Sequence, residues 1–336
     1  MNYIPILINT INTMLLYYTL YLAGEINMVD NSNPTMGQTI QGIPSSAGQQ
    51  PNMPAGNPLA KHLRQPKIYI KLPSGGKYWP EGSIEMPESG EFAVYAMTAK
   101  DEITFKTPDA LLNGQATVDV IQSCMPGIKD AWQMPSIDTD AILVAIRMAS
   151  FGEALDMKGK VPNTDIEREF QINLQNLLDK YTGTTYTDTF QIEGFKVQIQ
   201  PVTYKTVTQQ SVKAFEEQRI FTIINDDNAN PTEKLAKFQK SFKNLTEINM
   251  GIVIESVVAI QPDGETEAVT HRAHLREFLE NADAKVYNQI MDHITSQKNL
   301  FTQAPLKIEA TEEELAAGAP TTYEMPIQFD QSNFFG

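Results

Sequence analysis

The chain has 336 residues, a formal net charge of −15, 41% hydrophobic residues and one cysteine. This length can bury two modest cores, or one core with long tails. The acidic balance argues against a nucleic-acid partner, because phosphate binding relies on clustered Lys and Arg, and it favours solubility and basic protein partners. With Cys124 alone no intrachain disulfide can form, which fits a reducing cytosol, and we expect Cys124 to be a small buried hydrophobe on a helix.

Residues 1–27 form an apolar segment. The stretch from Ile4 to Leu22 carries no charge, and its length approaches a membrane span. No basic stretch precedes it, as a signal peptide would require. Three interpretations are open: a membrane anchor, a hydrophobic assembly segment, or translation of upstream sequence that is not normally expressed. We favour the last because Met28 opens a polar segment, and we expect membrane contact only if residues 1–27 are expressed.

Residues 28–65 are rich in Asn, Pro, Gly, Gln and Ser and contain few apolar anchors. Such a segment does not offset the entropy lost on ordering, so a disordered polar linker is predicted. Ordering of this arm on a partner protein is the alternative.

Residues 66–152 are predicted to form an α+β domain. Alternating apolar residues predict strands, and helical spacing or capping residues predict helices. The strands are expected at 67–72, 91–97 and 102–105, and the helices at 108–113, 117–124 and 139–150. The last helix carries Ile142, Ile146 and Ala149 at helical spacing, which indicates a buried stripe. Asp138 is placed to cap it.

Residues 153–201 are predicted to form a small β insertion. One hairpin is expected around the turn at 161–165, a second is expected around Gly194, and a short helix at 174–181 lies between them. Each turn contains residues that favour tight reversals of the chain.

Residues 202–300 show helical periodicity and predict a bundle of four or five helices. The stretch from Ile248 to Ile260 is apolar on nearly all sides and predicts a central buried helix. Residues 301–336 read as a loop-like acidic tail with an aromatic end. The expected fold class is therefore α+β: an N-terminal mixed strand and helix domain, a small β-hairpin insertion and a C-terminal helical bundle.

Candidate chemistry is sparse. His271 and His274 share one helix face, but Arg272 lies between them and the pattern departs from the zinc-protease motif. Gly75-Gly76-Lys77 lacks the first glycine and the Ser or Thr of a phosphate-binding loop. We find no nucleophile elbow and no paired cysteines. The sequence therefore predicts no enzyme activity, no metal site and no cofactor.

Five segments, taken in order along the chain, form recognisable sequence motifs. They are Leu72 to Trp79, Met97 to Glu102 with Thr107 to Gly114, Val120 to Pro126, Asp138 to Gly152, and Phe329 to Gly336. Together they resemble the baseplate hub subunit family of T4-like contractile-tailed bacteriophages, from about Lys67 to the C-terminus.

This resemblance implies a structural or assembly protein that acts through contacts with other phage tail and baseplate proteins and carries no chemistry. It places the chain in the host cytoplasm during assembly and in the baseplate of the virion tail. The alternative is a chaperone outside the virion that holds the tape-measure protein before the tube polymerises.

One departure from the family concerns cysteine. Similar proteins often carry paired cysteines after the segment that ends at Gly152, and again just before the C-terminal motif. Here the first place reads Val161 to Thr164 and the second is acidic. A thiolate zinc site needs about four ligands, so none can form. We expect this hairpin to be held by packing alone.

Partner contacts are expected at aromatic side chains, because these dominate the energetics of protein interfaces. The candidates are Tyr78 and Trp79 in the strand-turn, and Asn333, Phe334 and Phe335 at the C-terminus. Ordinary core packing is an equal alternative for Trp79, and docking of the C-terminal aromatic pair on its own domain is an alternative for that end.

Overall fold

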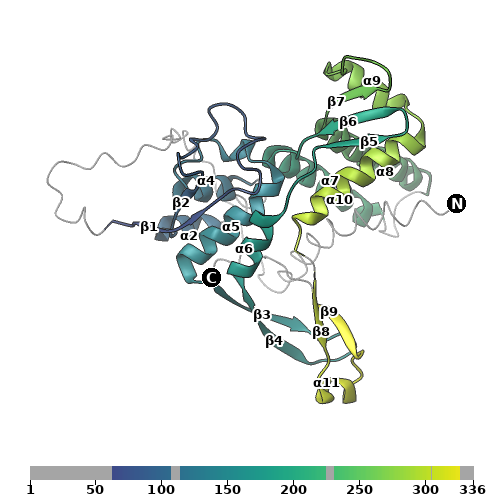
Figure 1. The fold of residues 1–336 in the computed structure, drawn as a ribbon. Helices are drawn as coiled ribbons and strands as arrows, with labels where there is room; N and C mark the ends of the chain where they lie inside the picture. Colours follow the sequence, from purple (N-terminus) through teal and green to yellow (C-terminus); the bar gives the residue numbers. More distant parts are fainter. Residues whose placement is uncertain (1–62, 107–113, 225–230, 304, 326–336) are drawn as a thin grey trace, which may run out of the picture.

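The computed structural model describes residues 63–106, 114–224, 231–303 and 305–325. These residues form three units, each with its own buried cluster. We call them the body (63–152 with 174–183), the C-terminal lobe (189–300) and the arm (154–173 with 306–325). The body lies beside the C-terminal lobe, and the arm projects away from both (Figure 1). The predicted α+β class is confirmed.

The body packs helices against one antiparallel strand pair, in which Ile68 lies opposite Val94. Its elements are β1 (Pro66–Ile70), β2 (Phe92–Tyr95), α2 (Ala99–Phe105), α4 (Gln115–Cys124), η2 (Ala131–Gln133), α5 (Ser136–Phe151) and α6 (Leu174–Gly183). Helix α5 is at the centre, with Ile142, Ile146 and Ala149 buried as the helical spacing predicted.

Residues 102–105, predicted as a strand, are helical. Helix α2 begins at a capping box in which Thr98 and Asp101 bond each other's backbone N–H groups. This box satisfies donors that a helix start otherwise leaves free. Asp101 and Phe105, four residues apart, then share the buried face. Local capping therefore decides the structure of a segment whose short apolar alternation suggested a strand.

Asp138 does not cap α5 as predicted, because the N-cap residue is Pro135 and Asp138 lies in the first turn. Its carboxylate is fully buried and points to the turn after β1. The Ser74 N–H donates to Oδ1 at 2.7 Å, and Ser74 Oγ and Trp79 Nε1 donate to Oδ2 at 2.5 and 2.7 Å. Asp138 thus ties this turn to the central helix.

The C-terminal lobe combines helices with a three-stranded antiparallel sheet of order β5-β6-β7. The elements are β5 (Thr189–Ile192), β6 (Phe195–Ile199), α7 (Tyr204–Ile224), α8 (Pro231–Ser256), β7 (Val257–Pro262), α9 (Arg272–Asn281) and α10 (Ala284–Leu300). The helix predicted to reach Ile260 ends at Ser256, because the β-branched run that follows pairs with β6 and places Ile260 opposite Val197. The hairpin around Gly194 therefore joins this sheet and does not stand in a separate insertion.

The arm is built from two hairpins far apart in sequence. They comprise β3 (Ala154–Lys160) and β4 (Glu167–Asn173), and β8 (Leu306–Glu309), α11 (Glu312–Ala316) and β9 (Thr322–Met325). The first hairpin was predicted. The second corrects the expectation of a loop-like tail: Ile308 lies opposite Tyr323 in an antiparallel pair, and Tyr323 and Met325 are buried.

Several predictions lie outside the described residues: the apolar segment 1–27, the linker up to residue 62, the helix at 108–113 and the C-terminal aromatic pair. The linker's last residues are described, and Arg64 is bonded to the body. Among the described helices, none has the length and hydropathy needed to cross a membrane.

The buried position of Asp138 predicts an unusual pH dependence. Burial raises the pKa of this carboxyl to about 6, although the hydrogen bonds from Ser74 and Trp79 lower it. The folded chain therefore holds the proton more tightly than the unfolded chain. The resulting stabilisation is fully present below about pH 4, and it is lost as the pH rises through 6.

We expect the free energy of unfolding of the wild type, relative to Asp138→Asn, to fall by about 1.4 kcal/mol between pH 5 and pH 7.5. This range stays above the sequence pI of about 4.7. Urea unfolding followed by tryptophan fluorescence measures the difference. A difference that stays constant over this range contradicts the assignment.

Candidate functional site

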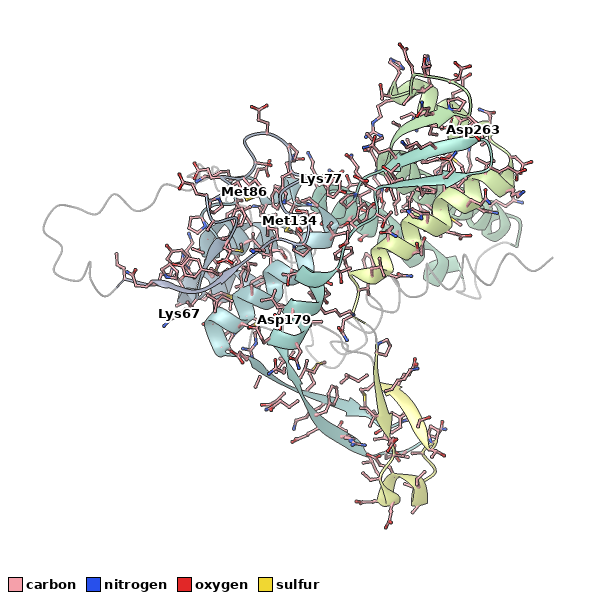
Figure 2. All side chains as sticks on the ribbon, in the orientation of Figure 1. Lys67, Lys77, Met86, Met134, Asp179 and Asp263 are labelled. Carbon is pink, nitrogen blue, oxygen red and sulfur yellow. The ribbon has the colours of Figure 1, made fainter. Side chains whose placement is uncertain are left out.

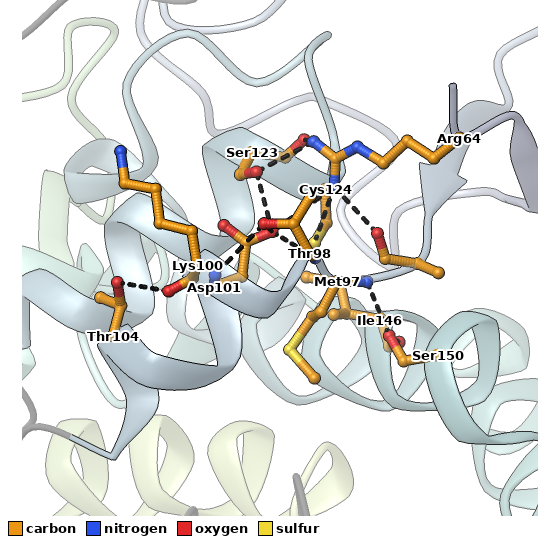
Figure 3. A network of polar contacts seen from close by, with 11 residues as sticks. Arg64, Met97, Thr98, Lys100, Asp101, Thr104, Ser123, Cys124, Ile146 and Ser150 are labelled. Carbon is orange, nitrogen blue, oxygen red and sulfur yellow. Dashed lines mark hydrogen bonds and ion pairs between the residues drawn. The ribbon is translucent and has the colours of Figure 1, made fainter. Parts of the chain in front are cut away.

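A polar network joins two of the sequence landmarks (Figure 3). The guanidinium of Arg64 donates to the Ala96 carbonyl at 2.8 Å, and to the carbonyl and Oγ of Ser123 at 2.6 and 2.9 Å. Asp101 Oδ2 accepts from Ser123 Oγ at 3.1 Å and from the Thr98 N–H at 2.7 Å. The landmark segments at 97–102 and 120–126 therefore meet at the start of α2 and the end of α4.

The network includes Cys124, whose sulfur lies 3.9 Å from the Arg64 guanidinium. Burial raises the pKa of the Cys124 thiol to about 12, so the thiol stays protonated and unreactive at neutral pH. The buried helical position predicted for Cys124 is confirmed. The Ser123 hydroxyl accepts from the Arg64 guanidinium and donates to the Asp101 carboxylate, so it links the two charged groups of the network.

The structure separates the roles of the two aromatic candidates in the strand-turn. Trp79 is 8% exposed and belongs to the body's core, where its indole N–H is bound by Asp138. Tyr78 is half-buried and faces the other way, toward the C-terminal lobe. Its ring meets Tyr186 edge-on at a centroid distance of 5.5 Å, and its hydroxyl donates to Asp188 at 3.2 Å.

We call Lys77, Tyr78, Tyr186, Asp188 and Phe301 the joint, because three separate passages of the chain meet there. The residues 184–188 connect α6 to β5, residue 301 follows α10, and Lys77 and Tyr78 belong to the body's turn. Lys77 lies on the side of the body that faces the C-terminal lobe (Figure 2), and its ammonium pairs with Asp188. Tyr186 also packs against Phe301 at 6.3 Å.

The electrostatics of the joint favour the ionised carboxylate. Burial alone would raise the pKa of Asp188, but hydrogen bonds from Lys77, Thr189 and Tyr78 outweigh burial and lower the pKa. Burial raises the pKa of the Tyr186 hydroxyl, which therefore stays neutral. The joint is thus a charge-assisted contact inside an aromatic cluster.

Helix α10 also contacts the connector, residues 184–188, and the strand β5 that follows it. Gln297 Oε1 accepts from the Thr187 N–H at 2.7 Å, and the His293 ring stacks on Phe190 at 3.8 Å. The chain also meets the body at a second crossing, where the segment before α7 bonds to the segment before α5 through main-chain groups. The Ser136 N–H donates to the Val202 carbonyl at 2.8 Å, and the Tyr204 N–H donates to the Met134 carbonyl at 2.7 Å. Two separated contacts of this kind restrict rotation of the lobes.

The arm has a packed core of its own at the turn of its first hairpin. Val161, at the hairpin turn, is fully buried with Ala319, Tyr323 and Met325. Gly159 permits the close approach, since a Cβ there would lie 2.1 Å from the Met325 sulfur.

An ion pair completes the arm. Arg168 pairs with Glu314 at 3.2 Å, and the Glu314 side chain is only 5% exposed. The Tyr323 hydroxyl donates to the same carboxylate at 3.3 Å, and Glu314 also closes a capping box with Thr311. These contacts hold the second hairpin on the first.

His271 and His274 lie at the start of α9, exposed, with ring centroids 4.7 Å apart. Within the described parts of the chain, no three His, Cys, Asp or Glu side chains gather where they could hold a metal ion.

In the described residues, the polar side chains singled out above join elements of the fold to one another, as in a protein whose sites serve its architecture. The family described as T4 bacteriophage base plate protein matches residues 65–317, and the chain belongs to this family. No curated protein and no solved structure matches the chain in our comparisons. Membership implies a structural or assembly role in the phage baseplate, a location in the virion tail and contacts with other tail proteins, and it suggests a non-enzymatic protein.

The family match covers four of the five landmarks. Asn333, Phe334 and Phe335 lie beyond residue 317 and outside the described residues, so their role stays a prediction.

Sequence reasoning missed Asp188, Tyr186 and the Arg168–Glu314 pair. Only Glu314 carried a local signal, because Thr311 and Glu314 have the spacing of a capping box before an apolar residue. The others depend on partners more than 100 residues away.

The joint predicts that Asp188→Asn loosens the connector between the lobes. The amide keeps an acceptor oxygen but loses the charge that pairs with Lys77, at a cost of about 1 kcal/mol for a partly exposed pair. Hydrogen exchange of the Thr187 amide, protected by Gln297, should then be about fivefold faster.

The matched control is Asp263→Asn, which removes the charge from an exposed contact with Gln191. Asp263 follows β7, at the end of the β5-β6-β7 sheet and away from the joint (Figure 2). Equal exchange at Thr187 in both variants contradicts a role for Asp188 in holding the lobes.

Proposed function

We propose that the chain is a permanent subunit of the baseplate hub and works by presenting fixed surfaces to neighbouring tail proteins. The observation that supports this proposal is the joint. An ion pair, an aromatic cluster and the contacts from α10 all act on one connector, and main-chain bonds fix the second crossing. A chain whose lobes are restricted in this way presents its surfaces in one relative geometry, which suits a component of a symmetric particle.

A second candidate is a chaperone for the tape-measure protein, and one feature favours it. Helices α7 and α8 pack against each other as a long pair, and Asn244 of α8 donates to Glu217 Oε1 of α7 at 2.6 Å. Gln210 Oε1 and Glu217 Oε2 are buried there without a hydrogen-bond partner. Unsatisfied polar atoms weaken a helix pair, and a weakly held pair can open to receive a helix of a client protein.

Quantitative mass spectrometry of purified virions distinguishes the two candidates. A hub subunit is expected at a fixed ratio to other baseplate proteins. Absence from virions together with abundance in infected lysate contradicts the hub proposal and supports the chaperone.

We also propose that the C-terminal residues Asn333, Phe334 and Phe335 dock on a neighbouring tail protein. Deletion of residues 332–336 should block incorporation into tails, because a buried aromatic anchor contributes roughly 2 kcal/mol or more to an interface. Thermal unfolding of the purified chain should be unchanged. The matched control is Gln331→Ala with Ser332→Ala, which keeps the aromatic pair, and normal tails from the deletion variant refute the docking role.

A further inference from the structure

The far end of the arm carries a groove. An open cavity of about 760 Å³ lies between the turn of the first hairpin and the end of α11. Its apolar lining comes from Val161, Pro162, Ile166 and Ala317, and the ion pair between Lys160 and Asp165 flanks it.

Next to this groove, an apolar side chain faces solvent. Leu315, two residues before Ala317, is 43% exposed although it lies on a helix whose neighbours Ala319 and Tyr323 build the arm's core. An exposed leucine beside an apolar groove forms the kind of surface that another protein covers.

The negative charge around the groove favours a positively charged partner. The arm holds nine acidic and four basic side chains, a net charge of −5. Glu314 is neutralised inside by Arg168, whereas Glu312 and Glu313 beside Leu315 are exposed. The helix dipole accounts for acidic residues in the first turn of α11 but not for Asp165, Glu167 or the acidic residues on β8 and β9, which are also exposed.

We propose that the arm's tip is a docking surface for a basic segment of another tail protein, with apolar residues that cover the groove and Leu315. This rests on the proposed function, in that it names a surface through which the chain docks. A second copy of this chain is the wrong partner, because its net charge of −15 would oppose the acidic arm.

The test places the photocrosslinking residue p-benzoylphenylalanine at Leu315 in phage-infected cells and identifies the crosslinked peptide by mass spectrometry. We expect one dominant segment of a different tail protein, with a net positive charge. A synthetic peptide of that segment should bind the purified full chain, and its Kd should rise at least tenfold between 50 and 200 mM salt.

Charge reversal provides the matched comparison. Glu312→Lys with Glu313→Lys should weaken peptide binding at least tenfold, whereas Glu265→Lys with Glu267→Lys, an equal change at exposed positions of the C-terminal lobe, should not. Hydrogen exchange of β8 and β9 verifies that the arm stays folded. If the arm unfolds in the charge-reversal variant, the salt dependence of peptide binding to the unaltered chain tests the proposal.

A crosslink to a second copy, a neutral or acidic crosslinked segment, binding that ignores salt, or no crosslink at all overturns the proposal. Virion content is measured in the same samples. A chain that enters tails without any crosslink at Leu315 refutes the arm's role and leaves the proposed hub function standing.

Discussion

The buried carboxylate of Asp138 is the contact on which the arrangement of the body and the C-terminal lobe depends. It accepts three hydrogen bonds from Ser74 and Trp79 and so fixes the turn after β1 on the central helix. The same turn carries Lys77 and Tyr78 to Asp188 on the connector. The turn is therefore held between two carboxylates, Asp138 on the central helix of the body and Asp188 on the connector, and it joins the connector to the body.

The two carboxylates behave differently because their surroundings differ. Asp138 has only neutral donors around it, so burial dominates and its pKa rises to about 6. Asp188 is partly exposed and faces an ammonium, so its pKa is lowered. The first contact orders the turn at some cost in stability at neutral pH, and the second holds the lobe most firmly when both groups are charged.

The parts of the fold that could be predicted from sequence are those with a long apolar repeat or with clear turn residues between two strands. Helix α5 repeats its apolar spacing over four turns, and the strands of the two central hairpins alternate around clear turn residues, so these were predicted correctly. Helix α2 has seven residues, and its capping residues outweigh an apparent alternation. For β7, periodicity does not distinguish a buried strand from a buried helix, and pairing with β6 decides. Strands β8 and β9 have four residues each, and only the facing hairpin makes them fold.

In the candidate site too, some features were predicted from sequence and others depend on tertiary contacts. The landmark segments at 97–102 and 120–126 were recognised as sequence motifs. Their contact with each other is visible only in the tertiary structure. Tyr78 and Trp79 were selected together because they are adjacent aromatics, but they lie in a turn, where the local backbone sends the two side chains to different partners. Trp79 packs inside with a polar partner for its N–H, as buried tryptophans usually do, and Tyr78 faces the joint.

The arm is a very small unit that is held by packing and an ion pair. A zinc ion would hold two hairpins by bonds that are independent of core size. Here four buried side chains and one buried ion pair must suffice, and a core this small stabilises little by itself. Phe170 and Leu306 contact both the arm's core and the body's core. The arm therefore draws part of its stability from the body at its base, while its tip is supported only by its own packing. Because the body anchors the base, the tip can carry a partly exposed apolar side chain such as Leu315, which lies outside the arm's buried cluster.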